Sequence, residues 1–90
     1  MLKTISITVT GKVQGVWFRK YTVEKANELG VTGYVRNLPD ESVYILATGS
    51  EEQLNAFSQW CYTGSPKSKV EQVIVKEETL NIIEGFHIVR

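Results

Sequence analysis

Residues 4–30 read TISITVTGKVQGVWFRKYTVEKANELG, and their pattern decides the fold. Apolar and polar side chains alternate strictly over residues 4–10, which predicts a strand with one buried face and one polar face. From about Phe18 the apolar period lengthens to that of a helix, and Gly30 is a natural end for that helix. The helical stripe consists of Phe18, Thr22, Ala26 and Leu29. This stretch therefore predicts a strand, a loop and a helix, in that order.

The rest of the chain continues the same kind of pattern. Ser50 is a good N-cap for a second helix, whose apolar side holds residues from Leu54 to Cys61. Turns are expected at Pro39-Asp40-Glu41 and at Gly64-Ser65-Pro66. Further strands are predicted at residues 31–38, 42–48, 70–76 and 86–89.

The order of these elements is strand, helix, strand, strand, helix, strand, with one short strand added at the end. Two β-α-β units folded together give one sheet with both helices on one face. We therefore expect an α+β fold, the ferredoxin-like β-α-β-β-α-β sandwich, with an antiparallel sheet and a short extra C-terminal strand. Ninety residues suit one domain, so residues 1–90 are expected to form a single domain.

The charge balance and the hydropathy pattern disfavour two classes of partner. Lys plus Arg number ten and Asp plus Glu number ten, without the basic excess of a nucleic-acid binder. No stretch approaches the roughly 20 apolar residues of a membrane span, and residues 1–4 lack the apolar run that a signal peptide would be expected to have. With a single cysteine, no internal disulfide is possible. We expect a cytoplasmic monomer that binds neither nucleic acid nor membrane.

The chain has one histidine, His87, and one cysteine, Cys61, which limits the available chemistry. A nucleophilic triad would have to use His87, which lies in a terminal stretch of alternating apolar residues and is expected to face solvent. One His and one Cys cannot form an ordinary zinc site, so we expect no metal and no cofactor. Cys61 is expected to pack in the second helix. An enzyme built on this chain would work with Arg, Asn, carboxylates and backbone groups.

Two distant positions are expected to converge at one edge of the sheet. A β-α-β crossover makes the first and second strands parallel, so their C-terminal ends reach the same edge. The loop of residues 11–18 follows the first strand, and Asn37 ends the second. With the third strand between them, the separation is about two strand spacings, on the order of 10 Å. Side chains of Arg19 and Asn37 can both reach that gap.

The loop itself has the chemistry of an anion site. Gly11 and Gly15 allow backbone conformations closed to other residues, and the first N–H groups of the following helix lack partners. Successive N–H groups at the positive end of a helix form a phosphate nest. Arg19 opposes the helix dipole, and a bound phosphate would remove this conflict because the guanidinium and the amides would share one anion. Trp17 is either a hydrophobic lip or a core side chain.

Two segments together resemble one known family. Residues 11–19, GKVQGVWFR, are similar nearly residue for residue to the phosphate-loop signature of the acylphosphatases. Residues 33–37, GYVRN, resemble that family's second motif at the expected distance downstream. The resemblance covers essentially the whole chain. It departs from the family pattern at Glu41, where glycine is common, and at Ser65, where proline is frequent, which puts turn stability in more doubt than chemistry.

This resemblance implies an activity and a set of roles. The chain would hydrolyse the carboxyl–phosphate bond of small acyl phosphates, giving a carboxylate and inorganic phosphate without metal or cofactor. Arg19 would bind the phosphoryl group, and Asn37 would hold the attacking water. The backbone amides expected to join Arg19 are those of Gln14, Gly15, Val16, Trp17 and Phe18.

Three alternatives are weighed against this interpretation. A single-stranded RNA binder of the same element order would need basic charge and paired aromatics on the open sheet face, whereas the chain is neutral and its third strand offers Tyr44. A phosphate-sensing domain of the same fold, without catalysis, stays open. A relative of the acylphosphatase-like domain of hydrogenase maturation carbamoyltransferases is the third, and the chain length favours a free-standing enzyme instead.

Overall fold

The computed structural model describes residues 1–90 and contains every predicted element, with bounds shifted by a few residues. Neither helix has the length and apolar character needed to cross a membrane. In chain order the elements are β1 (Lys3–Lys12), α1 (Phe18–Leu29), β2 (Thr32–Asn37), β3 (Val43–Gly49), α2 (Glu51–Thr63), β4 (Lys69–Glu78) and β5 (Phe86–Ile88).

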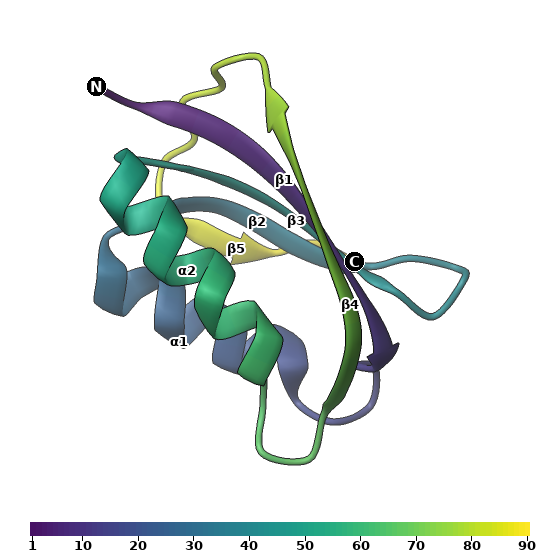
Figure 1. The fold of residues 1–90 in the computed structure, drawn as a ribbon. Coiled ribbons are helices and arrows are strands. Elements are labelled where there is room, and N and C mark those ends of the chain that lie inside the picture. Colours follow the sequence, from purple (N-terminus) through teal and green to yellow (C-terminus); the bar gives the residue numbers. More distant parts are fainter.

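The strands form one sheet in the order β4-β1-β3-β2-β5. β3 pairs antiparallel with both β1 and β2, so β1 and β2 run parallel and end at the same edge, as predicted. Both helices cover the same face of the sheet (Figure 1). This confirms the ferredoxin-like arrangement. The added strand β5 pairs parallel with β2, which makes the complete sheet mixed.

The core lies between the helices and the sheet. Ile7, Val9 and Ile45 from the strands are fully buried, and they belong to one hydrophobic cluster with Phe57 of α2. Cys61 of α2 is also fully buried and free, as its expected packing role requires. Burial raises the pKa of the Cys61 thiol to about 12, because the thiolate would lose its hydration there.

The two helices begin differently. α2 has the predicted cap at Ser50, whose Oγ accepts a hydrogen bond from Gln53 N–H at 3.2 Å, while Gln53 Oε1 accepts one from Ser50 N–H at 2.8 Å. α1 follows Trp17, which has a left-handed backbone (φ 64°) and gives no side-chain cap. The N-terminus of α1 is therefore left open to a ligand.

The role expected for Gly11 in the loop is wrong. β1 continues through Lys12, and the pairing with β4 shifts register between Thr10 and Gly11. At Gly11 the φ is +121°, and an added Cβ would lie 2.2 Å from the carbonyl oxygen of Lys69. Close approach of β4 at this bulge requires the glycine. The loop between β1 and α1 is therefore shorter than expected and spans residues 13–17.

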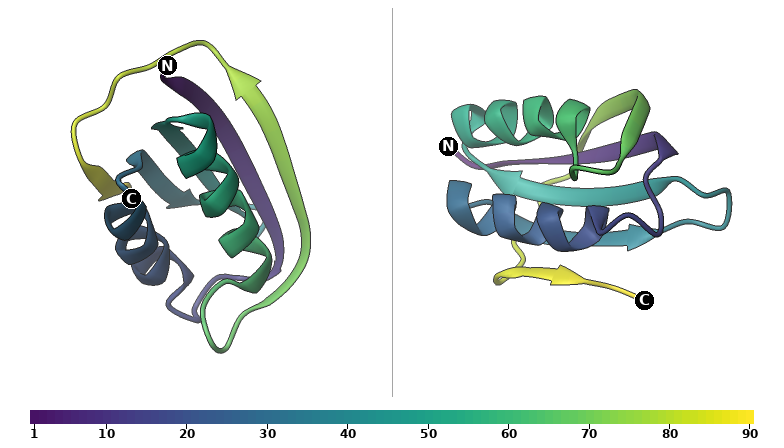
Figure 2. Two further views of the ribbon diagram at one scale, coloured as in Figure 1. Left: turned by 60° about the vertical axis from the view of Figure 1, so that its left-hand side comes forward. Right: turned by 90° about the horizontal axis from the view of Figure 1, so that it is seen from below.

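The polar face of β1 is less exposed than strict alternation predicts, because Thr4 is only 1% exposed. The segment between β4 and β5 crosses from one edge of the sheet to the other near this end of β1 (Figure 2). Its Asn81 donates a backbone N–H to Thr4 Oγ1 at 2.9 Å, and its carbonyl accepts from Thr48 Oγ1 at 2.6 Å. These hydrogen bonds satisfy the buried hydroxyls.

The turn between β2 and β3 holds a non-glycine residue in left-handed conformation, Glu41 at φ 73°. A side chain in this conformation costs roughly 1 kcal/mol or more, whereas glycine adopts it freely. We expect Glu41→Gly to raise the free energy of unfolding by about 0.5–1 kcal/mol, after the added entropy of the unfolded chain is deducted. Urea denaturation measures this change. Glu41→Ala keeps the strain and serves as the control, so an equal gain in both variants would contradict the explanation.

Candidate active site

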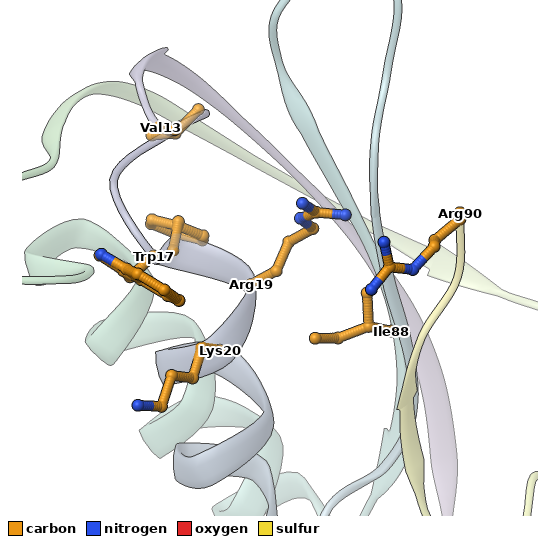
Figure 3. Close-up of a pocket in the computed structure, with 8 residues that line it drawn as sticks. Val13, Trp17, Arg19, Lys20, Ile88 and Arg90 are labelled. Atoms are coloured by element: carbon orange, nitrogen blue, oxygen red, sulfur yellow. The ribbon is translucent and has the colours of Figure 1, made fainter.

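A cavity of about 380 Å³ opens between the start of α1 and the end of β5 (Figure 3). Its apolar walls are Val13, Trp17, Phe18 and Ile88. The remaining lining residues are Gly15 and three cations, Arg19, Lys20 and Arg90. No Asp, Glu or His lines it, so the surface that faces the cavity is positive.

The loop before α1 has the geometry of an anion nest. Gly15 (φ 72°) and Trp17 (φ 64°) are left-handed, and Val16 between them is not. Alternation of this kind turns successive N–H groups toward one side of the chain. An added Cβ at Gly15 would meet nothing within 4 Å, so conformation rather than space requires this glycine. The backbone N–H groups of residues 14–20 donate to no acceptor in the protein, which leaves them free for an anion.

Two side chains fix the loop to the rest of the molecule. Gln14 Nε2 donates to the carbonyl oxygens of Leu38 at 2.9 Å and Ser42 at 2.8 Å, in the turn that follows β2. The buried Ser65 Oγ donates to the carbonyl oxygen of Val16 at 2.7 Å. In a trans peptide the N–H points opposite to the C=O, so this bond also fixes the Trp17 N–H. The buried Ser65 thus has a structural role in holding the loop.

The turn that receives Gln14 is stabilised by its own side chains. The Asp40 carboxylate accepts hydrogen bonds from the Ser42 hydroxyl and from the Ser42 N–H at 3.0 Å. These bonds hold the pKa of Asp40 below its ordinary value, the hydroxyl contributing most. The acceptor at Ser42 is therefore held in a fixed position relative to the loop.

Arg19 lies in the first turn of α1 and is half-buried at the cavity. It makes no hydrogen bond, and neither ion pair in the molecule involves it, since these join Lys3 to Glu51 and Lys25 to Glu28. The first turn also lacks an acidic residue. The guanidinium charge therefore adds to the positive end of the helix without compensation.

Asn37 ends β2 and is not among the residues that line the cavity. It lies two residues beyond Val35, whose partner Ile88 on β5 does line the cavity, so both strands lead to the same end of the sheet. The Asn37 Oδ1 atom is buried and has no hydrogen-bond partner. A buried acceptor of this kind calls for a donor such as water or a ligand.

The cavity thus unites part of the predicted site. Gly15, Trp17, Phe18 and Arg19 line it. Gln14 and Val16 belong to the same loop but contact the turn after β2 and Ser65 instead. Trp17 is 70% exposed, which places it as a lip rather than a core side chain.

Four lining residues were not expected from the sequence, namely Val13, Lys20, Ile88 and Arg90. The sequence could have indicated Lys20, because it is a second cation beside Arg19 in the first turn of the predicted helix. Ile88 and Arg90 reach the cavity through the parallel pairing of β5 with β2, for which no local pattern exists. No three His, Cys, Asp or Glu side chains come close enough together to hold a metal ion.

Comparison with known proteins gives consistent matches. The family model described as acylphosphatase matches residues 5–88. An acylphosphatase of Shewanella amazonensis is 49% identical over 77 residues, covering 86% of this chain and 85% of the relative. The crystal structure of an acylphosphatase from Bacillus subtilis superposes with a TM-score of 0.95 at 40% identity, covering 100% of both chains. A structure of full-length HypF in a phosphate- and nucleotide-bound form has a TM-score of 0.89 at 26% identity, over 100% of this chain and 12% of that protein.

Proposed function

Because the chain belongs to the acylphosphatase family, hydrolases that act on acid anhydrides, we propose that it hydrolyses acyl phosphates without a metal ion by means of Arg19, the loop amides and Asn37. The observation that supports these roles is the run of N–H groups without acceptors at residues 14–20, which belongs to the same segment as Arg19, a cation without a counter-ion. An unpaired cation at the positive end of a helix is unfavourable unless an anion binds there.

The phosphoryl group would be held by Arg19 and by the N–H groups of the nest. Phosphoryl transfer places charge on three equatorial oxygens, and fixed donors around them lower the barrier without reorganisation. A guanidinium can donate two parallel hydrogen bonds to such oxygens. Since the leaving group is a carboxylate, no strong general acid is needed.

Asn37 would orient the attacking water. Its buried, partnerless Oδ1 can accept a hydrogen bond from that water, which directs an oxygen lone pair at phosphorus, in line with the leaving carboxylate. The water's proton would pass to a phosphate oxygen of the substrate itself. Gln14 supports this placement, because it connects the nest to the turn immediately after Asn37.

The experiment that tests the proposal follows benzoyl phosphate hydrolysis by ultraviolet absorbance in excess EDTA. We expect turnover at the same rate with and without the chelator, because protein groups alone would stabilise the transferring phosphoryl group. Adding Mg²⁺ after EDTA is the control for a removable metal. Loss of activity in EDTA that Mg²⁺ restores would refute the metal-free mechanism, and no turnover by the folded protein would refute the activity.

The pH dependence of kcat tests the substrate-assisted proton transfer. The cavity lining contains no His, Asp, Glu or Cys, whose ordinary titration falls nearest to neutral pH. We therefore expect no bell-shaped profile of enzyme groups between roughly pH 5 and 8. The measurement is kcat for benzoyl phosphate across this range, with His87→Ala as the comparison. A sharp optimum that disappears in this variant would show that His87 takes part.

The alternatives make different predictions. A phosphate sensor would bind inorganic phosphate in calorimetry but leave benzoyl phosphate intact. The likeness to HypF concerns a small part of that protein, because the chain spans 12% of its length.

On the open sheet face, Tyr34 lies beside Tyr44 with ring centroids 6.3 Å apart, and Arg36 lies over Tyr44. These paired aromatics were not expected from the sequence, yet the neutral charge and the family favour the hydrolase.

A further inference from the structure

The turn between α2 and β4, residues 64–68, packs against the segment that forms the anion nest. Figures 1 and 2 show this turn beside the loop that connects β1 to α1. An added Cβ at Gly64 would lie 2.6 Å from a ring carbon of Phe18, the first residue of α1, so the two segments are in close contact. The turn is therefore well placed to fix the backbone of the nest.

Ser65 reaches from this turn to one carbonyl group of the nest. Its Oγ donates to the Val16 carbonyl oxygen at 2.7 Å, and no other group donates to that oxygen. Ser65 is 2% exposed, and its own carbonyl oxygen accepts hydrogen bonds from Ser68 N–H at 3.0 Å and from Ser68 Oγ at 2.7 Å. The Val16 carbonyl thus has a single, buried hydrogen-bond partner that is itself held in place.

The residue after this carbonyl has an unfavourable backbone conformation. Trp17 is left-handed, with φ 64°, where an L-residue places its Cβ too close to the following carbonyl oxygen. The peptide group between Val16 and Trp17 is planar and rotates as one unit, which changes ψ of Val16 and φ of Trp17 together. Such a rotation would return Trp17 to negative φ and relieve the crowding.

A rotated peptide would also oppose the binding of an anion. The N–H and C=O of a trans peptide point in opposite directions, so the rotation would turn the Trp17 N–H out of the nest and the Val16 carbonyl oxygen into it. The nest would lose one donor, and a partial negative charge would face the anion. The Ser65 hydroxyl opposes this rotation, because the Val16 carbonyl would lose its only partner in a buried position.

We propose that Ser65 is a positioning residue for the phosphate site, whose hydroxyl keeps the peptide between Val16 and Trp17 in the orientation that binds an anion. This inference rests on the proposed function and names the side chain that maintains the nest. Ser65 would not touch the phosphate but would act through the backbone. Because the Trp17 N–H would contact the phosphoryl group before and during transfer, loss of the hydroxyl should weaken binding and slow turnover together.

Calorimetry with inorganic phosphate and kcat/KM for benzoyl phosphate test this role. In Ser65→Ala we expect the Kd for phosphate to rise about tenfold and kcat/KM to fall by about 10–100-fold, because one donor among several is misplaced. Ser68→Ala is the matched control, since it removes hydroxyl hydrogen bonds from the same turn but keeps the bond to Val16, and it should leave both quantities unchanged.

The conformation of Trp17 supplies a readout that a purely structural role of Ser65 would not affect. Glycine adopts positive φ freely, so Trp17→Gly removes the reason for the peptide to rotate. Ser65→Ala should therefore cost less phosphate affinity in the Trp17→Gly background than in the wild type, which a double-mutant cycle measures. An equal loss in both backgrounds would contradict the mechanism.

Two further measurements keep the result unambiguous. Urea denaturation in phosphate-free buffer shows whether each variant is folded. If Ser65→Ala does not fold, Ser65→Cys decides, because it keeps a side chain of similar size but offers only a weak donor and should also lose affinity.

The possible outcomes separate this inference from the proposed function. Unchanged phosphate affinity in a folded Ser65 variant, or an equal loss in Ser68→Ala, would overturn the inference and leave the hydrolase proposal standing. A wild type that binds phosphate but does not hydrolyse benzoyl phosphate would refute the proposed activity alone. A wild type that does not bind phosphate would refute the nest and this inference with it.

Discussion

Replacing Arg19 with alanine is expected to lower kcat/KM for benzoyl phosphate by at least about 10³-fold, with losses in both substrate affinity and turnover. In the proposed mechanism the guanidinium contacts the phosphoryl oxygens in the ground state and in the transition state. Its loss therefore weakens substrate binding and also lowers kcat. Inhibition by inorganic phosphate should weaken in parallel. Steady-state kinetics with phosphate as a competitive inhibitor measure all three quantities.

The stability of the same variant distinguishes a functional role from a structural one. Arg19 makes no hydrogen bond and no ion pair, and it lies at the positive end of α1. Its removal should therefore leave the free energy of unfolding unchanged or raise it by about 0.3–1 kcal/mol in phosphate-free buffer. Arg19→Lys is the matched variant that keeps charge but loses the bidentate fork, and it should recover part of the activity. An inactive and unfolded Arg19→Ala would contradict this account.

Asn37→Ala is expected to lower kcat by about 10²–10³-fold while the inhibition constant for inorganic phosphate changes little. In the proposed mechanism Asn37 contacts the water rather than the phosphoryl group, so the anion nest stays intact. The native Oδ1 has no hydrogen-bond partner in the protein, so its loss breaks no hydrogen bond of the fold. Single-turnover kinetics and phosphate calorimetry together separate the two effects.

A matched variant sharpens the assignment of Asn37. Asn37→Asp keeps the shape but places a negative charge near the phosphate, so phosphate affinity should fall in this variant and not in Asn37→Ala. If Asn37→Ala abolished phosphate binding with the fold intact, the roles given to Asn37 and to the nest would have to be exchanged.

Local patterns were sufficient for most of the fold. Strict alternation over residues 4–10 and the stripe from Phe18 located β1 and α1, and Ser50 marked the start of α2. These signals are readable because each depends on residues within a few positions of one another. The parallel course of β1 and β2 then followed from the rule for β-α-β connections.

Interactions between distant segments account for what the sequence did not reveal. Gly11 is required by the approach of β4, and Thr4 is buried by Asn81, residues that lie far along the chain. Arg90 reaches the cavity only because β5 pairs with β2. The sequence of so short a strand does not predict which other strand it pairs with. The buried Oδ1 of Asn37 is likewise a property of the packed molecule rather than of residues 33–37.

The rate at which Cys61 is alkylated can report how often the folded molecule opens. Burial raises the pKa of the Cys61 thiol to about 12, so the reactive thiolate is scarce at neutral pH, and the side chain has no access to solvent. An alkylating reagent can therefore label Cys61 only when α2 separates from the sheet. Where reclosing is faster than labelling, the labelling rate follows the population of opened molecules. A phosphate ion bound at the nest would lower the rate of Cys61 labelling, because it favours the closed molecule. It would do so without any direct contact with the sulfur.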